Sequence, residues 1–293
     1  MFLSKSSSHR GFTILEILLA FAITLPAIFI ISRTTATVSD SYWRMLDRRI
    51  ATSRANSVFA LLKQPLYHAG FAMLSGKEFS SHFFSSITEP FSWGCAISCV
   101  TNEKIRIFYA LPLYTLVKNN ISTDTSSCTI DFTSTIDANK FSVSAYNIKS
   151  YVILKSANID NKVFRITSAT SNYIRVISQT DSSYSIGKND MVMGLRAIEA
   201  SANNGIFYTN DFRTSGVQPR IDGIWKIHFA YDEIKRLVTV TLIATGYREC
   251  DTPRVEGKKI LPSELIDELS SLLAKTKRNL FCYKRSFFLA NLN

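Results

Sequence analysis

The spacing of hydrophobic residues changes along the chain, beginning with an almost purely apolar run from Phe12 to Ile31. Glu16 is the single charged residue of this run of twenty. A helix of that length spans about 30 Å, the thickness of the hydrocarbon core of a bilayer. The run therefore predicts a membrane-anchoring helix over residues 12–31, with one carboxylate near its start.

Apolar residues then recur every three or four positions over residues 38–66, which is the spacing of an amphipathic helix. Charged residues, Arg54 among them, fall largely between the apolar ones. We therefore expect one long helix over residues 12–66. Pro26 should kink it or loosen one turn, and Gly70 should reverse the chain after it.

The remainder of the chain, residues 67–293, is rich in β-branched and aromatic residues punctuated by Ser, Thr, Asn and Asp. Such runs predict short strands, which we place at 104–109, 151–154, 163–166, 173–177, 225–231 and 237–243. A tight turn is expected at 187–190, an exposed loop at 122–134 and a helix at 261–274, capped near Ser263. The predicted fold class is α+β, with a mainly antiparallel sheet following the long helix.

Two basic residues, Lys5 and Arg10, precede the apolar run and place the start of the chain in the cytoplasm. The body is then expected outside the inner membrane, in a periplasm that permits disulfides. The chain has five cysteines, Cys95, Cys99, Cys128, Cys250 and Cys282. We predict a bridge between Cys250 and Cys282, which bracket the late helix, while Cys95, Cys99 and Cys128 compete for a second one. Their spacing does not suit zinc.

The string Gly11-Phe-Thr-Ile-Leu-Glu16, behind its short basic leader, resembles the type IV prepilin signal. The resemblance implies that residues 1–11 are a leader, that prepilin peptidase cuts between Gly11 and Phe12, and that the new amine on Phe12 is methylated. It also implies that Glu16 neutralises the N-terminal amine of a neighbouring subunit, which sets the axial register of a filament. The chain would be anchored in the inner membrane first and enter the filament later.

Within this superfamily the chain most resembles the PilW-type minor pilins, through residues 61–71, 183–193, 221–232 and 287–293. Pro65 and Tyr67 stand where that family usually has an acid and an arginine. The likeness implies a minor pilin that primes pilus assembly or sits at the tip, with other minor and major pilins as partners through the N-terminal helix. A pseudopilin of type II secretion is the alternative, because it shares the signal and the assembly logic.

The sequence contains no motif of a known catalytic or cofactor-binding site, so we expect neither an enzyme nor a bound cofactor or metal. His228 lies in a predicted strand and is interpreted as a facing or core side chain. The formal net charge is +11. Five basic residues approach a cluster near the end, at positions 275, 277, 278, 284 and 285. A body that binds nucleic acid or a host polymer is therefore a further alternative.

Overall fold

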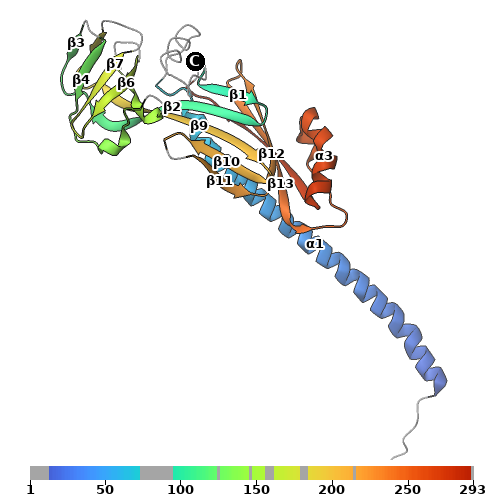
Figure 1. The fold of residues 1–293 in the computed structure, drawn as a ribbon. Coiled ribbons are helices and arrows are strands. Elements are labelled where there is room, and N and C mark those ends of the chain that lie inside the picture. The colour runs from blue at the N-terminus through green and yellow to red at the C-terminus, as the bar shows by residue number, and fades with distance from the viewer. Residues whose placement is uncertain are drawn as a thin grey trace, which may run out of the picture. The chain divides into compact units, whose positions relative to one another are not determined.

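The computed structural model describes residues 13–72, 95–123, 126–144, 147–155, 162–178, 184–213 and 216–291. The chain divides into two units, Met1–Arg48 and Arg49–Asn293. In the described residues the first unit is the start of a long helix. The second contains the end of that helix and a largely antiparallel β body (Figure 1). The fold is α+β, as the sequence predicts.

Helix α1 runs from Ile14 to His68 and is about 80 Å long at its 55 residues. The prediction of one continuous helix is confirmed for the described residues, and Pro26 lies within it without ending it. In its apolar part the hydroxyl of Thr24 donates to the carbonyl of Ala20 at 2.9 Å. That hydroxyl is therefore satisfied inside the helix. Gly70, at φ 72°, follows the helix end as predicted.

Among the described residues, the larger sheet has nine strands in the order β1-β2-β9-β5-β6-β7-β4, and β10 pairs with both β9 and β11. The strands are β1 (Ile97–Thr101), β2 (Lys104–Leu116), β4 (Ser127–Asp131), β5 (Tyr151–Lys155), β6 (Lys162–Ala169), β7 (Tyr173–Ser178), β9 (Met191–Asn203), β10 (Ile206–Asp211) and β11 (Val217–Asp222). Strands β2 and β9 pair antiparallel from Lys104 opposite Ser201 to Leu116 opposite Met191. This long pair is the centre of the sheet.

A second sheet has the order β12-β13-β15-β14. It contains β12 (Ile224–Asp232), β13 (Leu237–Glu249), β14 (Val255–Glu256) and β15 (Arg278–Phe288), of which β14 is parallel to β15. The remaining elements are β3 (Ile121–Thr123), which pairs with β8 (Tyr184–Ile186), the helix α3 (Ser263–Thr276) and three short 3-10 helices, η1 (Ala138–Lys140), η2 (Ile148–Ser150) and η3 (Lys258–Ile260). The six predicted strands all lie within observed strands.

Two predicted elements differ from the structure, and a third agrees to within one residue. The segment 122–134, expected to be a loop because of its polar composition, contains the strand β4. In this strand Ile130 is buried between exposed polar residues, which is the pattern of a strand with one face on the core. The cap expected near Ser263 is confirmed to within one residue, since the N-cap of α3 is Pro262. An apolar C-terminal strand is expected over residues 287–293, but β15 ends at Phe288 and residues 289–291 lie beyond it.

The main core lies between the last turns of α1 and the inner faces of both sheets. The helix contributes an apolar stripe, Ala51, Ala55, Val58, Phe59, Leu62 and Leu66. The sheets contribute residues from β2, β9, β10, β12, β13 and β15 to the same cluster. The predicted amphipathic pattern is therefore confirmed from Ala51 onward, since this stripe is the face that packs on the sheets.

Helix α3 covers the opposite face of the second sheet (Figure 1). Its buried residues Leu265, Leu269 and Leu272 contact Ile243 on β13 together with Leu280 and Cys282 on β15. Residues next to these in the strands, such as Leu242, face α1 instead. The second sheet is consequently covered on both faces, by the end of α1 on one and by α3 on the other.

Candidate functional site: the apolar helix start and its glutamate

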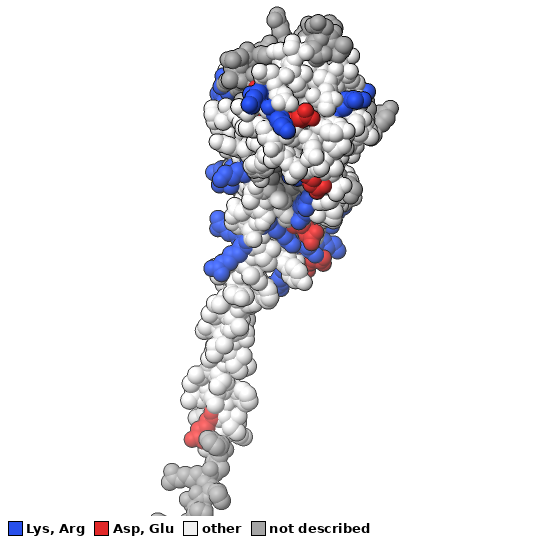
Figure 2. All heavy atoms as spheres, turned by 90° about the vertical axis from the view of Figure 1, so that its left-hand side faces the viewer, with Lys and Arg blue, Asp and Glu red and all other residues white. Residues whose placement is uncertain are grey.

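Residues 14–31 of α1 are all exposed to solvent, and all except Glu16 and Thr24 are apolar. By length and composition this helix could span a membrane. Figure 2 shows the beginning of the helix as white except for one acidic side chain. Glu16 is the only Asp or Glu between residues 13 and 39. The apolar surface and its carboxylate together form the candidate site.

Glu16 closes the first turn of α1 with Thr13. The backbone N–H of Thr13 donates to Glu16 Oε2 at 2.9 Å, and the backbone N–H of Glu16 donates to Thr13 Oγ1 at 3.3 Å. This reciprocal pair is a capping box, which satisfies two N–H groups that a helix start otherwise leaves unbonded. The positive end of the helix dipole also favours a carboxylate at this place. Sequence reasoning missed Thr13, although Thr-x-x-Glu is the pattern of a capping box.

The predicted processing residues Gly11 and Phe12 lie outside the described residues. Cleavage between them therefore stays a prediction. The described chain begins at Thr13, the residue that caps the helix.

Arg54 fixes the other half of α1 to the second sheet. Its Nη1 donates to the carbonyl oxygen of Thr245 at 2.7 Å and to that of Gly246 at 3.2 Å. The guanidinium also lies against Gly223, where an added Cβ would come within 2.4 Å of Nη1. Sequence reasoning treated Arg54 as one of the charged residues between the apolar ones and did not anticipate this contact.

The predicted bridge between Cys250 and Cys282 is not formed in the structure, where both are free thiols. Cys282 lies on β15 opposite Ile243, whereas the backbone N–H of Cys250 donates to the carbonyl of Lys277 at 2.7 Å. Five residues of extended strand, about 16 Å, separate Lys277 from Cys282. Disulfide Cα atoms lie within about 7 Å. Because β13 and β15 are antiparallel, Cys250 meets the start of β15 and not its middle.

The other three cysteines occupy two separate places. Cys99 on β1 packs against the main core, and burial raises its pKa, to which the nearby thiol of Cys95 adds. Cys128 on β4 packs with a different cluster that includes Tyr184, and burial raises its pKa as well. The structure therefore separates Cys128 from the Cys95 and Cys99 neighbourhood.

Side chains on β12 hold α3 in place. Lys226 Nζ lies 2.7 Å from Glu268 of α3 and 2.6 Å from Glu103 in the β1–β2 turn. Burial alone would lower the pKa of Lys226, but its bonds to the two carboxylates raise it. His228 Nε2 lies 3.3 Å from Glu264 Oε2, with 12% of the side chain exposed. His228 is thus a facing residue under a helix, the position that the sequence predicts.

Two of the basic residues near the end of the chain, Lys275 and Arg285, lie on different faces of the second sheet. Lys275 Nζ lies 5.4 Å from the ring centre of Trp225, which packs with the α3 cluster. The guanidinium of Arg285 lies 5.6 Å from the ring centre of Phe59 on the α1 side. Binding of nucleic acid by this part of the chain stays a prediction.

Comparison of the chain with models of protein families, with curated proteins and with solved structures finds no match. The functional conclusion accordingly rests on this chain's own helix, its glutamate and the body that holds the helix end.

Proposed function

We propose that this chain is a minor pilin of the PilW type, anchored in the inner membrane by its apolar helix until a filament takes it up. The observation that carries the proposal is Glu16, a lone carboxylate in the first turn of an exposed apolar helix. The resemblance of residues 11–16 to the prepilin signal supports it. The function is assembly through helix packing and not turnover, with prepilin peptidase and other pilins as partners.

The energetic role of Glu16 follows from its surroundings. A carboxylate within a bilayer costs about 2.5–3.5 kcal/mol on insertion scales, so it is retained where a partner repays that cost. Thr13 provides one hydrogen bond, to Oε2. The methylated amine of a neighbouring Phe12 would provide the opposite charge inside a dry filament core. A pair of this kind fixes the register of two subunits, because leaving either charge unpaired is costly.

Complementation of a deletion strain tests the proposal. Wild-type protein, Glu16→Val and Asp40→Ala are expressed at equal levels, and surface pili are counted by electron microscopy. Asp40 is a matched control, since it is an acid on the same helix but lies beyond the apolar segment and pairs with Arg44. Wild type and Asp40→Ala should restore piliation, while Glu16→Val should insert into the membrane yet fail to restore it.

Two results would overturn the proposal. One is a deletion strain with normal pili that has lost type II secretion, which assigns the chain to the pseudopilins. The other is full piliation by the Glu16→Val protein, which removes the role of the carboxylate.

A further inference from the structure

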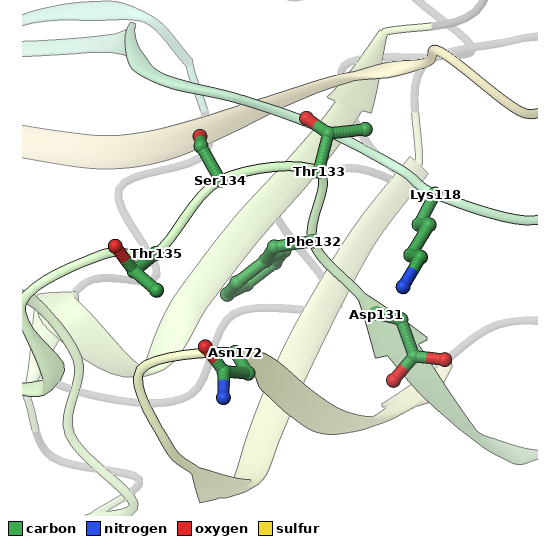
Figure 3. Close-up of a pocket in the computed structure, with 7 residues that line it drawn as sticks. All are labelled: Lys118, Asp131, Phe132, Thr133, Ser134, Thr135 and Asn172. Atoms are coloured by element: carbon green, nitrogen blue, oxygen red, sulfur yellow. The ribbon is translucent and has the colours of Figure 1, made fainter.

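A polar cavity of about 320 Å³ lies beside β4 and β7, at one end of the strand order of the larger sheet. It is lined by residues of three separate segments. Lys118 follows β2, Asp131 ends β4, residues 132–135 follow it, and Asn172 is in the β6–β7 turn. In Figure 3 the ring of Phe132 lies in the middle of this group. Lys118 and Asp131 are on one side of the ring, and Thr135 and Asn172 are on the other.

Backbone hydrogen bonds fix the walls of this cavity. The N–H of Lys118 donates to the carbonyl of Asp131 at 2.9 Å, and the N–H of Phe132 donates to the carbonyl of Asn172 at 2.8 Å. The Phe132 ring is buried and stacks on Phe141 with ring centres 5.9 Å apart. Backbone hydrogen bonds therefore fix the walls of the cavity, and the buried Phe132 ring behind them is held against Phe141.

Four side chains on the walls are available to a ligand. Those of Lys118, Asp131, Thr135 and Asn172 make no hydrogen bond or ion pair with the part of the chain that the structure describes. They supply an ammonium donor, a carboxylate acceptor, and a hydroxyl and an amide that can both donate and accept. One cation and one anion give the lining no net charge, which disfavours a ligand with a strong charge of either sign.

Two exposed tyrosines are connected through the backbone to residues of the cavity wall. Tyr114 is 88% exposed and has φ 58°, a conformation that is rare and strained for a bulky residue. Its carbonyl accepts from Ser134 Oγ of the cavity wall at 3.4 Å. Tyr173 follows Asn172 directly and is partly exposed. Tyrosine rings give rigid contact area that is apolar on its face and polar at its tip.

We propose that this cavity binds one neutral sugar ring of a polysaccharide. A sugar ring presents adjacent hydroxyls, which match the donors and acceptors that the four wall side chains offer. Ligand pockets are commonly about 300–1,000 Å³, so the cavity holds one ring and no more. Further units of the polymer would lie over the rim, near Tyr114 and Tyr173. This inference does not depend on the proposed function, because it concerns the β body alone.

The test uses the full chain, purified in a zwitterionic detergent that contains no sugar. Saturation-transfer NMR is recorded with glucose, galactose, mannose and N-acetylglucosamine, and with inorganic phosphate as the charged probe. At least one neutral sugar should receive saturation from the wild-type protein, with weak, millimolar affinity. Asp131→Ala and Asn172→Ala should each weaken that binding about tenfold or more, and Tyr114→Ala should weaken it less.

Asp251→Ala is the matched control, because it removes an exposed carboxylate far along the chain from the cavity. It should bind the sugar as the wild type does. Thermal unfolding of every variant checks that the exposed substitutions leave the body folded. The inference is overturned if none of the four sugars receives saturation, if only phosphate binds, or if folded Asp131→Ala and Asn172→Ala proteins bind as well as wild type.

Discussion

The guanidinium of Arg54 on α1 donates to the carbonyl oxygen of Thr245 on β13 at 2.7 Å, across 191 residues of chain. A second bond, to Gly246, measures 3.2 Å. These contacts accompany the apolar stripe from Ala51 to Leu66 and give the helix a fixed rotation against the second sheet. Apolar packing alone tolerates small rotations, whereas a directed hydrogen bond does not.

Arg54→Ala should destabilise the body by on the order of 2 kcal/mol, because bonds to a charged donor typically contribute about 1.5–3 kcal/mol. Urea denaturation of the full chain in detergent, followed by circular dichroism, measures the change. Lys63→Ala is the control, an exposed cation on the same helix that should shift stability by less than about 0.5 kcal/mol. Equal effects of the two substitutions would contradict the anchoring role of Arg54.

Gly223→Ala should be more harmful than Gly216→Ala. Both glycines have positive φ, 75° and 81°, so alanine incurs about 1–2 kcal/mol of backbone strain at either. At Gly223 the new Cβ would also approach Arg54 Nη1 to 2.4 Å, while at Gly216 no described atom beyond its chain neighbours lies within 4 Å of it. The difference between the two variants, measured by urea denaturation, isolates the steric clash. In an Arg54→Ala background that difference should shrink, and an unchanged difference would refute this explanation.

The sequence was sufficient for the elements whose signals are local. The apolar run and the three-to-four spacing predict α1, and short β-branched runs predict strands such as β12 and β13, because both patterns report which side chains are buried. The prediction of a loop at 122–134 was wrong because the buried positions there are few. Its polar composition hid two buried positions, Ile130 and Phe132, of which Ile130 lies in β4.

Such patterns do not report contacts between residues that are far apart in the chain. Periodicity marks Arg54 only as a charged residue between apolar ones, and it carries no information on carbonyl groups in β13. The Cys250–Cys282 bridge failed because it depended on strand register, which places Cys250 beside Lys277. The capping partner of Glu16 was readable in principle, since Thr13 lies three residues before it.

Thr13→Val should loosen the first turn of α1 while leaving the carboxylate in place. It removes the oxygen that accepts from the Glu16 N–H, and loss of an N-cap typically costs about 0.5–2 kcal/mol. Hydrogen exchange in detergent should show faster exchange of the Glu16 amide. Thr24→Val makes the same change where the hydroxyl donates within the helix, to Ala20, and should leave that amide unaffected. Equal exchange in both variants would rule out the capping box.

Cys282 should resist alkylation in the folded protein, because burial raises the pKa of its thiol to about 11 from an ordinary value of 9.0. Iodoacetamide at pH 8, followed by peptide mass spectrometry, should label Cys250 well before Cys282. Cys250 is partly exposed, whereas Cys282 lies beneath α3. Prompt labelling of Cys282 under conditions that keep the protein folded would contradict this burial.

The same thiol makes stability depend on pH in a definite direction. A folded-state pKa above the unfolded value means that the folded protein holds the proton more tightly. The contribution of this thiol to the free energy of unfolding is therefore complete below about pH 9 and is lost as the pH rises through about 11.

The Cys282→Val substitution removes this titration at similar side-chain volume. Between pH 8.5 and about pH 11, the wild type should lose on the order of 2 kcal/mol more unfolding free energy than Cys282→Val does. Cys250→Val, the matched control, should follow the wild type. Parallel pH profiles for wild type and Cys282→Val would show that Cys282 ionises as freely in the folded chain as in the unfolded one.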